Sequence, residues 1–107
     1  MAYPVLLTEG AARDLSDIDH SIRTRDGNER ADHVLERLES LLSSLSALPQ
    51  RGNHPPELVA LGLWEYREVF FKPYRVIYRL RDGRIYVYLI ADGRRDMQTL
   101  LQRRLLG

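Results

Sequence analysis

The sequence predicts an α+β domain in which an N-terminal helical hairpin packs on an antiparallel β-sheet and a short C-terminal helix follows. The first half of the chain repeats apolar residues at helical spacing, whereas the part after Pro56 is rich in aromatic and β-branched residues. Two turn pairs, Lys72-Pro73 and Asp82-Gly83, divide that second part into segments of strand length. With 107 residues, of which 44% are hydrophobic, we expect one globular domain over residues 1–107.

The N-terminal half predicts two antiparallel helices. Apolar residues recur at helical spacing after a favourable N-cap threonine, so the first helix is expected over about residues 9–23. Turn residues 25–28 follow, and Asn28 is expected to cap the next helix. A leucine-rich stripe over residues 31–48 makes the second helix, which a proline ends. Because the connection is short, the two helices form a hairpin with one shared apolar face.

The C-terminal half predicts a three-stranded antiparallel meander over residues 64–71, 74–80 and 85–91. The opening residues 1–7 are expected to add an edge strand. Residues 96–106 have the amphipathic pattern of a short terminal helix. The preceding loop, residues 49–56, is expected to lack regular structure.

Alternation along the second strand assigns its residues to two faces of the sheet. Val76 and Leu80 are expected under the helical hairpin, together with Ile85, Val87 and Leu89 of the next strand. Arg75 and Arg79 would then lie on the opposite, open face.

Charge is distributed unevenly along the chain. Residues 1–63 contain six arginines and ten acidic residues, whereas residues 64–107 contain nine arginines and one lysine against five acidic residues. The net charge of +1 therefore conceals a basic C-terminal half. Such a surface is suited to a nucleic acid or an acidic protein as partner.

The basic residues of the sheet are the candidate site. Guanidinium groups bind phosphate and aromatic rings stack on bases, so an arginine-rich open face with Tyr86 and Tyr88 beside it indicates nucleic-acid or target binding. The candidate binding residues are Arg67, Arg75, Arg79, Arg94 and Arg95, with Lys72 in a neighbouring turn. The alternative is a salt-bridged sheet whose arginines pair with Glu65, Glu68, Asp92 and Asp96.

Other site chemistries find little support in the sequence. The chain has no cysteine, its three histidines fall in different expected elements, and its glycines do not form a phosphate-binding loop. We therefore expect no metal, no cofactor and no small-molecule substrate. The N-terminal residues lack the pattern of a secretion signal or membrane anchor, so a cytoplasmic location without a membrane partner is expected.

Several motifs occur in the order found in the RelE/ParE superfamily of type II toxin–antitoxin toxins, which the sequence resembles over almost its whole length. They are the DLSDI segment beginning at Asp14, the leucine-rich second helix, the YRE and YRVIY strands and the GRRD segment ending at Asp96. The resemblance implies a helical hairpin on an antiparallel sheet. It also implies a growth-inhibiting toxin that a cognate antitoxin neutralises.

Two activities follow from this resemblance. RelE-like members cut mRNA on the ribosome, and the matching catalytic positions would be Arg67, Lys72, Arg75 and Arg95. Arginine stays charged at ordinary pH and is a poor proton donor, so a cleaving site needs another group. Many cleaving members carry a tyrosine or histidine in the C-terminal segment, whereas residues 96–101 here contain neither.

ParE-like members have a longer helical hairpin and poison DNA gyrase without cutting RNA. The long hairpin, the DLSDI segment and the missing proton donor favour this activity, in which the arginines bind the target and catalyse nothing. A third hypothesis is an inert binding module of the same fold. Whether the protein is an enzyme is therefore left open at this stage.

Overall fold

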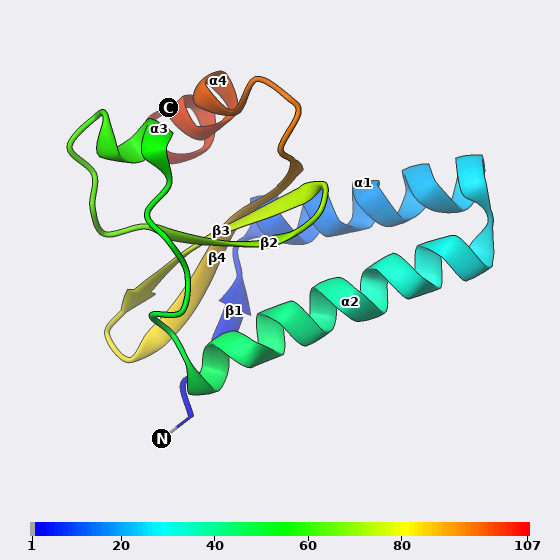
Figure 1. The fold of residues 1–107 in the computed structure, drawn as a ribbon, viewed down its shortest axis with the longest axis horizontal. Helices are drawn as coiled ribbons and strands as arrows, with labels where there is room; N and C mark the ends of the chain where they lie inside the picture. Colours follow the sequence, from blue (N-terminus) through cyan, green and yellow to red (C-terminus); the bar gives the residue numbers. More distant parts are fainter. Residues whose placement is uncertain (1) are drawn as a thin grey trace.

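A computed structural model of the protein describes residues 2–107. Two long antiparallel helices lie against a four-stranded sheet, and two short helical segments lie on its other side (Figure 1). The elements are β1 (Val5–Leu7), α1 (Glu9–Asp26), α2 (Asn28–Ala47), α3 (Pro56–Val59), β2 (Arg67–Phe71), β3 (Tyr74–Arg81), β4 (Arg84–Asp92), α4 (Met97–Leu101) and the π-helical turn η1 (Gln102–Leu106).

The helical hairpin is confirmed, and its tip projects well past the sheet (Figure 1). Thr8 caps α1 as predicted, because its hydroxyl accepts a hydrogen bond of 3.1 Å from the amide of Ala11. The prediction that Asn28 caps α2 is wrong. Gly27, at φ 95°, separates the helices, and Asn28 is already the first residue of α2. Among residues 2–107, no helix is long and apolar enough to cross a membrane.

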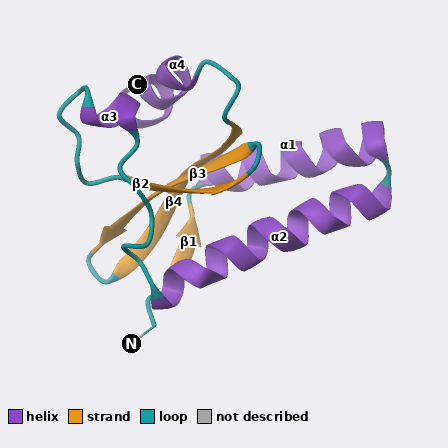
Figure 2. Ribbon diagram, viewed as in Figure 1, coloured by secondary structure: helices purple, strands orange, loops and turns teal. Residues whose placement is uncertain are grey.

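The sheet has the strand order β1-β4-β3-β2 (Figure 2). Strands β2, β3 and β4 form the predicted antiparallel meander, although β2 begins at Arg67 rather than at Trp64. The expected edge strand is present as β1, and it pairs in parallel with β4, so the sheet is mixed. The part of that prediction that concerns Met1 lies outside the described residues. Asp82 and Gly83 both have positive φ, as a two-residue turn between β3 and β4 requires.

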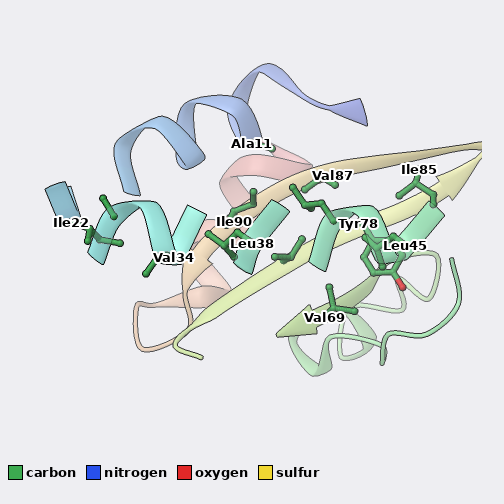
Figure 3. Packing of buried hydrophobic residues seen from close by; sticks show 13 residues of the cluster. Ala11, Ile22, Val34, Leu38, Leu45, Val69, Tyr78, Ile85, Val87 and Ile90 are labelled. Carbon is green, nitrogen blue, oxygen red and sulfur yellow. The ribbon is translucent and has the colours of Figure 1, made fainter. Parts of the chain in front are cut away.

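The main hydrophobic core lies between the hairpin and the sheet (Figure 3). From α2 it receives Val34, Leu38 and Leu45, which are at most 2% exposed. The sheet supplies apolar side chains from all three strands of the meander. They are Val69, Val76, Tyr78, Ile85, Val87 and Ile90. The predicted assignment of Val76, Ile85 and Val87 to the face under the hairpin is therefore confirmed.

The prediction for Leu89 is wrong because β4 contains a β-bulge. Val87 pairs with Tyr78 and Leu89 pairs with Ile77, so Tyr88 has no partner residue of its own. One extra residue reverses the alternation that follows it. Leu89 consequently packs on the second face of the sheet, and Ile90 takes the place under the hairpin.

The second face of the sheet is not open along its whole length, contrary to the prediction. Helices α3 and α4 lie over part of it (Figure 1). A second core forms there from Leu58, Ile77, Leu89, Ala91, Met97 and Leu101. The sequence prediction treated residues 49–56 as a loop and did not include α3. It also extended the terminal helix to residue 106, whereas α4 ends at Leu101 and a π-helical turn follows.

Candidate functional site

Arg75 is buried in an ion pair rather than displayed on an open face. Its Nε donates a hydrogen bond of 2.7 Å to Glu68 on the neighbouring strand β2. The two terminal nitrogens donate bonds of 2.8 and 2.7 Å to the two carboxylate oxygens of Glu57 on α3. The side chains of Arg75, Glu57 and Glu68 are 11%, 24% and 4% exposed. Both fork directions of the guanidinium are therefore occupied by carboxylates of the same chain.

This ion-pair cluster (Glu57, Glu68 and Arg75) affects its two acids in opposite directions. The hydrogen bonds from Arg75 lower the pKa of Glu57. Burial raises the pKa of Glu68, because the loss of hydration destabilises its carboxylate more than the hydrogen bond from Arg75 stabilises it. The bonds to Glu57 raise the pKa of Arg75 further above its already high value. Arg75 is thus permanently charged, and two carboxylates neutralise it.

Glu57→Gln is expected to remove a pH-dependent part of the stability. Ionised Glu57 stabilises the fold at pH values above its unfolded pKa of about 4.5, and this contribution disappears as the pH falls through the lower folded pKa. The difference in unfolding free energy between wild type and variant should therefore shrink from pH 7 to pH 3, as measured by urea denaturation. A difference that stays constant over this range would contradict the role assigned to Glu57.

Arg67 lies on the other face from Arg75. It pairs in register with Tyr78, whose ring belongs to the main core, so both project toward the hairpin side. The guanidinium donates to the carbonyl of Gly52 at 2.8 Å and to that of Gln50 at 3.3 Å. Arg67 therefore fastens the loop before α3 to the edge of the sheet, and the prediction that it shares a face with Arg75 is wrong.

Arg79 does lie on the second face, as predicted, in a part that α3 and α4 leave accessible. Its guanidinium carbon is 5.8 Å from the centre of the Tyr66 ring. Tyr86 is its register partner on β4, and the Tyr88 ring lies 5.5 Å from that of Tyr66. Arg79 thus packs against a cluster of tyrosine rings and is separate from the buried Arg75.

The remaining basic candidates lie in turns at the far ends of the strands. Arg94 is 80% exposed and pairs with Asp92 at 2.6 Å. Arg95 lines a shallow cleft between α1 and the sheet, together with Tyr74 and Arg25. Burial raises the pKa of the Tyr74 phenol. Lys72 is exposed in the turn between β2 and β3.

The predicted arginines therefore occupy several separate environments and do not form one cationic cluster. The alternative of a salt-bridged sheet is confirmed for two of its four acids, because Glu68 binds Arg75 and Asp92 binds Arg94. Asp96 instead caps α4, where its side chain accepts from the amide and hydroxyl of Thr99.

A further ion pair, which sequence reasoning did not identify, joins α1 to the C-terminal segment. Asp14 accepts bonds of 2.8 and 2.9 Å from Arg104 and a further bond of 3.0 Å from the amide of Ile90. Arg104 also donates to the carbonyl of Tyr88, the bulge residue. The position of Asp14 at the start of the DLSDI segment could have marked it as a residue of interest, but no sequence pattern indicated that Arg104 is its partner.

Comparison with known sequences gives consistent matches. A family model described as the ParE toxin of the type II toxin–antitoxin system parDE matches residues 5–97. Toxin ParE3 of Caulobacter vibrioides is 30% identical over 100 residues, which cover 94% of this chain and 96% of ParE3.

Comparison with solved structures shows a shared fold. A chain of the chromosomal ParDE TA system from P. aeruginosa matches with a TM-score of 0.71 at 19% identity, covering 85% of this chain and 96% of the other. A chain of the toxin–antitoxin complex RelBE2 from Mycobacterium tuberculosis gives a TM-score of 0.62 at 21% identity, covering 86% and 99%. These likenesses confirm the helical hairpin on a sheet.

Proposed function

Because the chain belongs to the ParE toxin family of type II toxin–antitoxin systems, we propose that it inhibits growth by poisoning DNA gyrase in the cytoplasm and that a cognate antitoxin neutralises it. The family match over residues 5–97 carries this proposal. The fold adds a long helical hairpin, with helices of 18 and 20 residues, whose tip extends past the sheet (Figure 1).

The arrangement of the arginines supports a gyrase poison over an mRNA endonuclease. A cleaving site needs cations aimed at the scissile phosphate and a group that transfers a proton. Arg75 is held by Glu57 and Glu68, and Arg67 is held by loop carbonyls on the other face. These contacts take two of the four residues of the proposed nuclease set (Arg67, Lys72, Arg75, Arg95) away from a common phosphate.

Two features support an antitoxin that adds a strand or helix. Within residues 2–107, β1 has no strand on its outer side, and Leu6 and Leu7 beside that edge are 41% and 36% exposed. An unpaired edge with apolar side chains is suited to strand addition by a partner. The similar ParDE and RelBE2 structures come from toxin–antitoxin systems. We expect acidic residues in the partner, to meet the basic C-terminal half.

The test is induction of the protein without its antitoxin, read out in parallel as gyrase-linked DNA breaks and as mRNA 5′ ends. We expect growth arrest with DNA breaks, intact mRNA, and inhibition of supercoiling by the purified protein. Protein mixed beforehand with its antitoxin is the control and should leave supercoiling unchanged. Codon-phased mRNA ends would replace the proposal with a ribosome-dependent nuclease, and harmless expression would indicate the inert module.

A further inference from the structure

The part of the second sheet face nearest the β3–β4 turn carries a cluster of aromatic rings that gyrase poisoning leaves unexplained. Its rings belong to Tyr66, Tyr86 and Tyr88, and each is half-buried. The Tyr66 and Tyr88 rings meet edge to face at 5.5 Å, and those of Tyr86 and Tyr88 lie 6.5 Å apart. Rings fixed in this way expose rigid apolar area to solvent at little cost in side-chain entropy.

The bulge in β4 joins this cluster to the second core. Tyr86 and Tyr88 share a face by ordinary alternation, and the extra residue at Tyr88 brings Leu89 to that same face. Leu89 anchors the segment in the second core, while Tyr88 adds a third ring beside Tyr66. Arg79 packs over Tyr66 from β3 and restricts the rings on that side.

Positive charge extends the cluster toward the β3–β4 turn. Arg81 and Arg84 are register partners, both are exposed, and alternation places them on the same face as Arg79 and Tyr86. Arg81, Asp82, Tyr86 and Tyr88 line one surface depression. Asp82 is 83% exposed and lies 3.8 Å from Arg81, so it offsets only part of the charge of three arginines.

We propose that this aromatic–arginine surface (Tyr66, Arg79, Arg81, Arg84, Tyr86 and Tyr88) binds single-stranded nucleic acid. Unpaired bases stack on Tyr86 and Tyr88, and Arg81 and Arg84 bind the adjoining phosphates. The tyrosine rings can stack on exposed base faces and the guanidinium groups can bind phosphates, so together they are complementary to a nucleic-acid strand whose bases are unpaired. Paired bases in a duplex do not present their faces, so the surface favours single strands. The inference does not require gyrase to be the target.

Binding is tested by fluorescence anisotropy with the purified, antitoxin-free protein and labelled DNA of about 20 nucleotides, longer than the ~4–16 nucleotides that a single OB-fold domain covers. The same sequence as RNA and as duplex DNA completes the set. Tyr86→Leu should weaken single-strand binding by about 5- to 150-fold, the effect of one lost stack. Arg81→Gln/Arg84→Gln should flatten the dependence of log affinity on log salt by about 1.4, for two lost phosphate contacts.

The matched control is Arg13→Gln/Arg30→Gln, which removes the same charge from exposed positions on the helical hairpin. It should keep the wild-type affinity and salt dependence. Equal weakening by both arginine pairs would show unspecific attraction and overturn the proposal, as would absent binding or an unaffected Tyr86→Leu. Loss of antitoxin binding in the site variants without any binding of DNA or RNA would make the surface a protein interface instead. Because this assay contains no gyrase, its failure leaves the proposed function standing.

Discussion

Arg75→Ala is expected to lower the free energy of unfolding by about 3–5 kcal/mol, the range for breaking a buried ion pair from one side. The substitution leaves Glu57 and Glu68 facing each other without their shared cation, and Glu68 is only 4% exposed. It also removes the methylene groups that pack closely against Gly93. Urea denaturation at pH 7 measures the loss.

Two companion variants distinguish this cause from a general effect of losing an arginine. Arg94→Ala removes an ion pair whose arginine is 80% exposed, and its unfolding midpoint should match that of wild type. Arg75→Met/Glu68→Gln removes both buried charges and should recover part of the loss. If Arg75→Ala unfolds like wild type, the cluster does not stabilise the fold. A loss of toxicity in Arg75→Ala would therefore be explained by reduced stability of the fold and would not show that Arg75 contacts the target.

Gly52→Ala is expected to destabilise the protein by about 2–4 kcal/mol, from overpacking and a lost hydrogen bond. A Cβ at this buried position would overlap the carbonyl oxygen of Glu68 and lie 2.8 Å from the Tyr78 hydroxyl. The loop would have to move away from β2, where Asn53 and Glu68 exchange two backbone hydrogen bonds of 3.1 and 2.7 Å. Thermal or urea unfolding measures the effect.

Tyr78→Phe is the control for Gly52→Ala. It removes only the hydroxyl that accepts from the Gly52 amide at 3.1 Å, so it should cost less, about 1–2 kcal/mol. The double variant relieves the contact with the hydroxyl but retains the overlap with the Glu68 carbonyl. It should therefore remain less stable than either wild type or Tyr78→Phe, and a return to wild-type stability would contradict this account.

The sequence was sufficient for the hairpin and the meander because their signals are local. Thr8 as N-cap, the leucine stripe of α2 and the Asp82-Gly83 turn each depend on neighbours within a few residues. The side of Leu89 was not predictable in this way. A bulge is set by how β4 pairs with β3, and the alternation of residues 85–91 contains no sign of an extra residue at Tyr88.

The candidate site was harder to predict than the fold, because the position of an arginine in the sequence does not indicate which group it binds. Arg75 and Arg79 are four residues apart on one strand and share a face, yet one is buried between carboxylates and the other packs on a ring. The difference arises from α3, a helix that the sequence prediction did not include, which brings Glu57 over Arg75. Arg104 and its partner Asp14 are likewise far apart in the sequence, at a separation of 90 positions.

We expect the parallel pairing of β1 with β4 to be a late step in folding. Val5 meets Ile85, so this contact closes a loop of about eighty residues, whereas the hairpin and the meander close short loops. Contacts between distant residues form late, because the entropy of loop closure must be offset first. The outer edge of β4 therefore stays unpaired while the rest of the sheet is already assembled. During that interval the folding chain exposes an edge of β4 that β1 covers in the final state.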